Sequence, residues 1–214
     1  MKHFLSLMFL AGAVATPAAF AQKWEVGFAA GGSFFTSETV SNPAGNASAT
    51  RQPGVALSAW LDNSIGSGLF GGELRYDYEM GDLKLSSGGT TATFGSRSNA
   101  VHYDFVFNFA SSEAAVRPFI EAGGGVKMYS GTGTEQVYQP LSNIAVFSDV
   151  RDVRPLVSVG GGIKFNVAKN TLMRLEVHDY LTSFPSTLIA PVPPSTVGGW
   201  FNDFVVSAGI SFGL

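Results

Sequence analysis

The stretch GELRYDYEM, residues 72–80, decides the fold. Apolar and charged side chains alternate strictly along it, which is typical of a β-strand with one apolar and one polar face. The charged members are Glu73, Arg75, Asp77 and Glu79. Four charges in a row on one face are an unusual density for a sandwich core or a half-buried sheet. The segment therefore predicts a strand whose charged face needs a special environment.

The same alternation recurs along the chain. In VHYDFVFNF, residues 101–109, apolar side chains alternate with a second face that carries His102 and Asp104. Similar patterns, weakest in the second and seventh segments, predict eight strands in all. They cover residues 24–31, 55–61, 72–80, 101–109, 116–129, 157–165, 173–178 and 203–214.

The connections between these strands alternate between long and short. The long ones are residues 36–52, 81–97, 130–152 and 181–199, and the short ones are residues 62–68, 110–115 and 166–170. In an antiparallel up-and-down order, all four long loops would emerge at one end. Loops above about 12–15 residues are uncommon in compact soluble domains. Outer-membrane barrels, in contrast, combine short periplasmic turns, longer extracellular loops and an even number of strands.

Composition narrows the class of protein. The 214 residues are 45% hydrophobic and only 14% charged, with 26 Gly and no Cys, whereas ordinary soluble domains are about 25% charged. The lack of Cys excludes disulfide scaffolds and thiolate chemistry, and a net charge of −3 argues against nucleic acid as a partner. Beyond the N-terminus no run approaches the roughly 18 apolar residues of a spanning helix. The sequence therefore predicts one all-β domain, an eight-stranded antiparallel up-and-down transmembrane β-barrel.

The first residues have the pattern of a secretory signal peptide. Lys2 and His3 precede an apolar run over residues 4–14, and Ala19 and Ala21 form a small-x-small cleavage site. We expect residues 1–21 to be the signal peptide and residues 22–214 to be the barrel domain.

Three stretches carry a resemblance to a known family. They are VRPFIEAGGGVKMYSG (116–131), its echo RPLVSVGGGIKF (154–165) and FVVSAGISFGL (204–214). With them the chain resembles the small outer-membrane β-barrels of the OmpA/OmpX type, including the opacity-protein-like barrels. The resemblance implies the outer membrane of a Gram-negative cell envelope, contact with outer-membrane lipid and lipopolysaccharide, and the barrel-assembly machinery as a partner during insertion. Family members typically end in an aromatic residue, whereas this chain has Phe212 and ends in Leu214.

A barrel of this kind would enclose the charged faces of its strands. The predicted interior polar network consists of Glu73, Arg75, Asp77, Glu79, His102, Asp104, Arg117, Glu121, Lys127, Lys164, Arg174, Glu176 and His178. Eight strands enclose an interior just wide enough for side chains to fill, and buried charges must be paired. We therefore favour a salt-bridged plug over a proton or ion path. A secreted, lipocalin-like soluble barrel would need the reverse orientation of the two faces.

Two His-acid pairs raise the hypothesis of a hydrolase. They are His102 with Asp104 and His178 with Asp179. Lipid A deacylases among the outer-membrane barrels carry a His-x-Ser arrangement, and neither histidine here has Ser two residues later. We expect no catalytic residue and no enzyme. The spacing of His, Asp and Glu also matches no zinc or calcium motif, so we expect no metal and no cofactor.

The expected role is structural or surface-interacting, with the four long loops outside the cell as a contact surface for an extracellular partner, and the barrel as a monomer. The alternatives are a porin-like narrow pore for small solutes and a lipid A-modifying enzyme. The first two long loops are polar, which suits solvated surface loops. The fourth, residues 181–199, is uncharged and apolar, so it either contacts a partner or the membrane, or folds over the barrel mouth.

Aromatic residues near the strand ends are candidates for girdles at the two membrane interfaces. They are Trp24, Trp60, Tyr78, Phe109, Tyr129, Tyr180 and Trp200.

Overall fold

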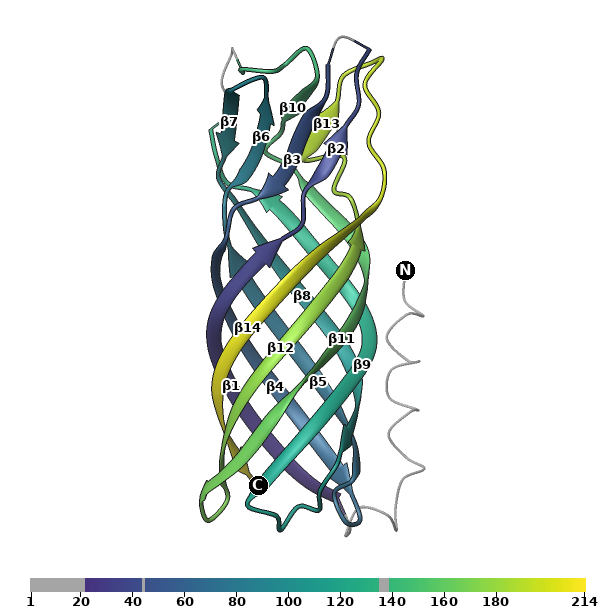
Figure 1. Cartoon of the computed structure of the whole chain (residues 1–214). Helices are drawn as coiled ribbons and strands as arrows, with labels where there is room; N and C mark the ends of the chain where they lie inside the picture. The colour runs from purple at the N-terminus through teal and green to yellow at the C-terminus, as the bar shows by residue number, and fades with distance from the viewer. Residues whose placement is uncertain (1–21, 44, 135–138) are drawn as a thin grey trace, which may run out of the picture.

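Eight long strands close on themselves in the computed structural model, which describes residues 22–43, 45–134 and 139–214 (Figure 1). The barrel strands are β1 (Gln22–Phe35), β4 (Gly54–Ile65), β5 (Phe70–Met80), β8 (Ser96–Asn108), β9 (Val116–Gly131), β11 (Arg151–Ala168), β12 (Thr171–Ser183) and β14 (Trp200–Gly213). Each pairs antiparallel with its neighbours in the closed order β1-β14-β12-β11-β9-β8-β5-β4. The predicted eight-stranded antiparallel barrel is confirmed. The predicted signal peptide, residues 1–21, lies outside the described residues.

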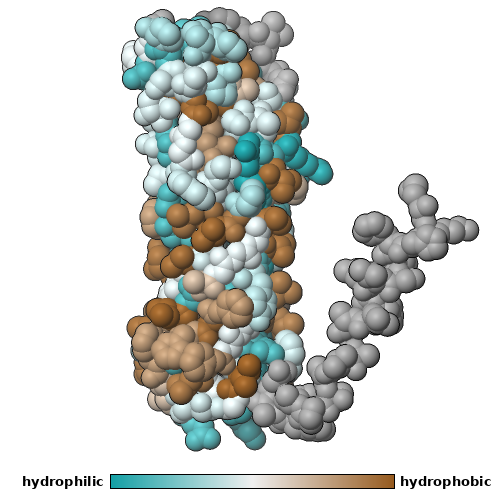
Figure 2. All heavy atoms as spheres, turned by 90° about the vertical axis from the view of Figure 1, so that its right-hand side faces the viewer, coloured by the Kyte–Doolittle hydropathy of each residue, from teal (hydrophilic) through white to brown (hydrophobic). Residues whose placement is uncertain are grey.

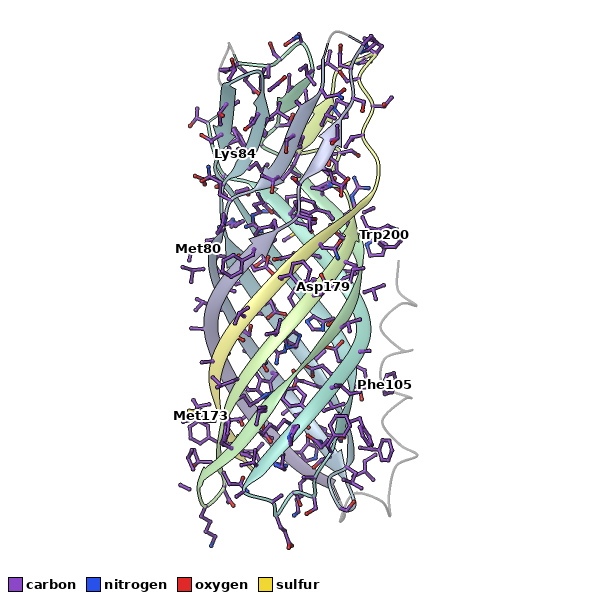
Figure 3. All side chains as sticks on the ribbon, in the orientation of Figure 1. Met80, Lys84, Phe105, Met173, Asp179 and Trp200 are labelled. Atoms are coloured by element: carbon purple, nitrogen blue, oxygen red, sulfur yellow. The ribbon has the colours of Figure 1, made fainter. Side chains whose placement is uncertain are left out.

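The two faces of each strand meet opposite environments. On β5, Leu74 and Tyr76 are exposed on the outside, whereas Glu73 and Arg75 are buried inside. Outward side chains such as Phe105 and Met173 project away from the barrel wall (Figure 3). Alternation along a strand places successive side chains on opposite faces of the sheet, so the strict pattern of residues 72–80 produces this division. The orientation is the one predicted for a membrane barrel and the reverse of a lipocalin.

The outside of the barrel is apolar over its middle and lower parts. Brown, hydrophobic spheres gather there, and pale or teal ones dominate the upper end (Figure 2). Exposed apolar side chains include Phe28, Leu57, Val101, Ile120 and Leu175. A hydrophobic belt of this kind is the surface that a barrel presents to lipid hydrocarbon. No helix among the described residues is long and apolar enough to cross a membrane.

The described residues of all four long connections lie at the upper end in Figure 1, as predicted. They are not plain loops, however. They contain six short strands, β2 (Glu38–Val40), β3 (Ala47–Arg51), β6 (Leu83–Ser87), β7 (Thr90–Phe94), β10 (Ala145–Phe147) and β13 (Ile189–Pro191). These form one sheet in the order β2-β3-β6-β7 and a second sheet of β10 and β13. We call this assembly of six strands and their connections the cap.

The cap has its own hydrophobic core, so the prediction of solvated polar loops was wrong for the first two connections. Val40 and Leu83 are fully or almost fully buried in it, with exposed fractions of 0% and 1%. The fourth connection contributes Phe184, Leu188 and Ile189 to the same core. It therefore folds over the barrel mouth, which is the second of the two alternatives predicted for it. Tyr129 and Phe201 extend the core down into the top of the barrel.

The aromatic girdle prediction was wrong for three residues. Trp60, Tyr129 and Tyr180 are buried inside the barrel, because they stand at the inward positions of β4, β9 and β12. Trp24 and Trp200, in contrast, are exposed on the outside near the lower and upper ends. Position relative to a strand end does not decide which face a side chain occupies, whereas position in the alternation does.

Candidate functional site

The barrel interior is the candidate site. It holds all thirteen residues of the predicted polar network, and none of them is more than 6% exposed. They come from β5, β8, β9, β11 and β12. Their contacts divide into a central, a lower and an upper group along the barrel, and two histidines lie beside the central group.

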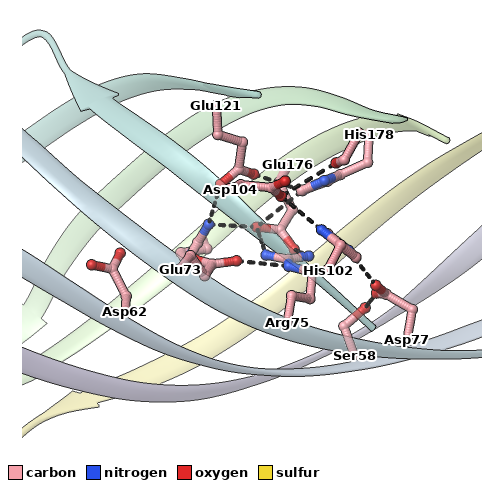
Figure 4. Close-up of polar contacts among 12 residues, drawn as sticks. Ser58, Asp62, Glu73, Arg75, Asp77, His102, Asp104, Glu121, Glu176 and His178 are labelled. Atoms are coloured by element: carbon pink, nitrogen blue, oxygen red, sulfur yellow. Dashed lines mark hydrogen bonds and ion pairs between the residues drawn. The ribbon is translucent and has the colours of Figure 1, made fainter. Parts of the chain in front are cut away.

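The central group crosses the barrel from wall to wall. Arg75 on β5 donates from Nη1 and Nη2 to the two carboxylate oxygens of Glu176 on β12, at 2.7 and 2.9 Å (Figure 4). Arg174 on β12 donates back to Glu73 on β5 at 2.5 Å. Since β5 and β12 are four strands apart in a ring of eight, these pairs span the lumen. The bidentate geometry is the strong form of an arginine–carboxylate contact.

The lower group contains a second bridge across the lumen. Lys164 on β11 donates to Asp62 on β4 at 2.6 Å, and these strands also lie opposite each other. Arg117 and Glu25 line a cavity of about 300 Å³ at the lower mouth. The alternation on β4 continues to Asp62, two residues after Trp60, so the inward position of Asp62 could have been predicted from the sequence.

The upper group ties the barrel to the cap. Lys127 Nζ donates to Glu79 at 2.9 Å and is also paired with Asp203 on β14. Arg51, which comes from β3 of the cap, donates to Ser98 at 2.6 Å and lies 3.4 Å from Glu79. Sequence reasoning missed Arg51 because it belongs to a long connection. It missed Asp203 although the residue stands at an inward position of the last strand.

The two buried histidines sit among carboxylates. His102 lies between Asp77 and Asp104, with 2.9 Å from Nε2 to Asp77 and 2.9 Å from Nδ1 to Asp104. His178 Nε2 lies 2.9 Å from Glu121 Oε1. Both ring nitrogens of His102 are thus in contact with carboxylates, which leaves neither to activate a serine hydroxyl as a general base.

The second predicted His-acid pair is not brought together. Asp179 lies on the outer face of β12, where it accepts a hydrogen bond from Asn202 at 3.0 Å (Figure 3). His178 points inward, as the alternation of adjacent strand positions requires. The hydrolase hypothesis therefore loses one of its two pairs.

Chemically, most of the interior is a network of ion pairs and hydrogen bonds between strands. Charged pairs cross the lumen in the central and lower groups, and Tyr180 on β12 adds a hydrogen bond to Asp77 on β5 at 3.1 Å. The guanidinium groups of Arg75 and Arg174 lie over the ring of Trp60, with Cζ 4.9 and 4.5 Å from the ring centroid. An apolar belt outside and an ion-paired interior define a transmembrane β-barrel.

Several solved structures of outer-membrane proteins are similar to this chain at low sequence identity. Neisserial surface protein A matches with a TM-score of 0.56 and 12% identity, over 89% of this chain and 96% of that protein. The outer membrane protein OprG of Pseudomonas aeruginosa matches with a TM-score of 0.51 and 11% identity, over 91% and 96%. The outer membrane protease OmpT of Escherichia coli matches at 0.42 and 8%, over 90% and 97%.

No protein-family model and no curated protein matches the sequence. The structural matches show that the chain has the fold of the small outer-membrane β-barrels, which confirms the fold that the sequence resemblance implied. At 11–12% identity they carry over no activity.

Proposed function

We propose that the protein is a closed outer-membrane barrel with a structural and surface-interaction role, which holds the cap at the outer face of the cell. One observation carries this proposal: ion pairs bridge the lumen, and the apolar core of the cap covers its upper end. These ion pairs occupy the space through which a solute would have to pass. The exposed part of the cap is then the surface available for contact with a partner.

The cap is suited to such a role because it is a folded surface. One edge strand of its four-stranded sheet is β7, which carries the exposed residues Thr90, Thr91 and Thr93. Packing of Phe94 on Phe147, with ring centroids 5.6 Å apart, fixes this strand to the opposite sheet. A rigid surface loses little conformational entropy when a partner binds. The partner would meet a surface of threonines and other small polar groups.

Conductance separates this proposal from the narrow pore. Purified protein inserted into planar lipid bilayers is expected to give no steady single-channel current, because buried ion pairs occupy the lumen. A porin inserted into the same membrane serves as the positive control. Regular current steps from the wild-type protein would favour the pore and contradict a closed barrel.

We also propose that the protein is not an enzyme, since both interior histidines contact carboxylates and, among the described residues, neither ring forms a hydrogen bond with a hydroxyl group. Refolded protein incubated with lipopolysaccharide is expected to leave the lipid A acyl pattern unchanged in mass spectra. Loss or transfer of an acyl chain would support the lipid-modifying alternative.

We also propose that the barrel is a monomer. Sedimentation of the detergent-solubilised protein is expected to give the mass of a monomer.

A further inference from the structure

We propose that Asp104, Glu121 and His178 form a binding site for one divalent transition-metal ion of the zinc type inside the barrel. They lie on β8, β9 and β12, and one potential ligand atom of each is within 4.8 Å of the others. The three side chains converge in Figure 4 beside the central ion pairs. This site is independent of the surface role proposed above.

The first argument is that the donor atoms of this cluster lack hydrogen-bond partners. Asp104 Oδ1, Glu121 Oε2 and His178 Nδ1 are buried without one, and His178 Nε2 lies 2.9 Å from Glu121 Oε1 as an ion pair without hydrogen-bond geometry. The three residues are 0%, 2% and 0% exposed. Buried polar atoms in native proteins are almost always satisfied, so a group of them aimed at one point calls for a ligand. A bound cation would satisfy all three residues together.

The second argument is charge. Among the described residues, the barrel interior contains nine buried carboxylates, from Glu25 to Asp203, and six buried Lys and Arg side chains. The nearest guanidinium to Glu121, that of Arg174, is 3.9 Å away, which is the longest of the ion pairs in the interior. Asp104 pairs only with His102, so neither carboxylate of the cluster has a close Lys or Arg partner among the described residues. A divalent ion would offset two of the excess negative charges.

The donor set selects the kind of ion. One imidazole nitrogen and two carboxylate oxygens are ligands that zinc accepts at about 2.0–2.2 Å, usually with a fourth position left for water. Imidazole also suits other first-row transition metals but not magnesium or calcium, which prefer oxygen alone. In a tetrahedral shell at these bond lengths, the ligand atoms lie about 3.3–3.6 Å from one another. Small side-chain movements would therefore complete the site.

Two glycines leave room for the cluster. A Cβ at Gly123 on β9 would come within 2.4 Å of Asp104 Oδ1, and a Cβ at Gly160 on β11 would come within 2.8 Å of His178 Nδ1. Any larger residue at either position would press on a donor atom. The two glycine triplets of the sequence thus contribute space to the same small region of the lumen.

Zinc content of the folded protein tests the proposal. The full chain is refolded in detergent with Zn²⁺, dialysed, and analysed for zinc by elemental mass spectrometry, with folding verified by circular dichroism. The expected result is about one zinc per folded chain, and the Zn K-edge absorption spectrum should show an imidazole ligand. Folded wild-type protein that retains no zinc, or a zinc shell without imidazole, would overturn the proposal.

Three conservative variants locate the ion. Asp104→Asn, Glu121→Gln and His178→Gln are each expected to lower the zinc affinity at least tenfold. Asp203→Asn is the matched control, because it alters a buried carboxylate of the upper group, and its zinc affinity should stay within twofold of wild type. Equal retention by the folded cluster variants and the control would place the zinc elsewhere and refute the site. If one variant does not fold, the other two decide.

Discussion

Arg75 donates hydrogen bonds to Glu73 on its own strand and to both oxygens of Glu176 across the lumen. Arg75→Ala would leave these carboxylates buried without it. Breaking a buried pair in this way typically costs about 3–5 kcal/mol. We expect the free energy of unfolding in lipid vesicles, measured by urea titration of tryptophan fluorescence, to fall by about that amount.

Arg97→Ala is the control for this change. Arg97 is exposed on the outer face of β8, next to Met80 near the top of the barrel. Exposed substitutions usually change stability by no more than about 0.5 kcal/mol. Equal losses from both variants would mean that the central pairs do not stabilise the barrel.

The glycine triplet on β9 allows a test of lumen crowding at single-residue resolution. A Cβ at Gly125, which faces inward, would lie 2.0 Å from the carbonyl oxygen of Val101, whereas one at Gly124, which faces outward, would lie 3.1 Å from its nearest atom. Gly125→Ala is therefore expected to destabilise the barrel by about 1–3 kcal/mol through overpacking. Gly124→Ala should cost clearly less in the same urea titration. The reverse order would contradict the inward position of Gly125.

At the scale of elements, the cap core is distinct from a smaller cluster of buried apolar side chains inside the barrel, so the cap and the barrel should be separable by mutation. Phe94 is 7% exposed and stacks on Phe147 within the cap. Phe94→Ala should remove about 3–5 kcal/mol of packing from the cap core. We expect amide hydrogen exchange in β6, β7 and β10 to accelerate, while exchange in the middle of β9 and β12 stays at the wild-type rate.

Thr93→Ala is the matched control on the same strand, because Thr93 is exposed on the opposite face of β7. It should leave exchange in the cap close to wild type. Faster exchange throughout the barrel in Phe94→Ala would show that the two cores fold as one unit.

The elements also show what the sequence could predict. Long strands such as β5 were readable because strict alternation of charge and apolarity continues for nine residues (72–80). The cap strands, of three to five residues, are too short to show a period, and their pairing depends on contacts between distant connections. Arg51, on the cap strand β3, reaches the barrel interior because of this pairing, so its position could not be predicted from the sequence.

The candidate metal cluster could not be predicted from the sequence, for a related reason. Its three residues stand on β8, β9 and β12 and meet only because the barrel closes. Spacing along one segment, which reveals a zinc finger or a calcium loop, carries no signal when the ligands come from separate strands.

At the scale of the whole molecule, we expect closure of the barrel to make its unfolding cooperative and its folded form resistant to detergent. Every barrel strand pairs on both edges, so no free edge exists in the barrel from which unfolding could begin. The ion pairs across the lumen must also separate together. We therefore expect the unheated protein to migrate on SDS gels at a position different from that of the boiled protein. Recovery in the soluble periplasmic fraction, or identical migration before and after boiling, would contradict a closed barrel held in the outer membrane.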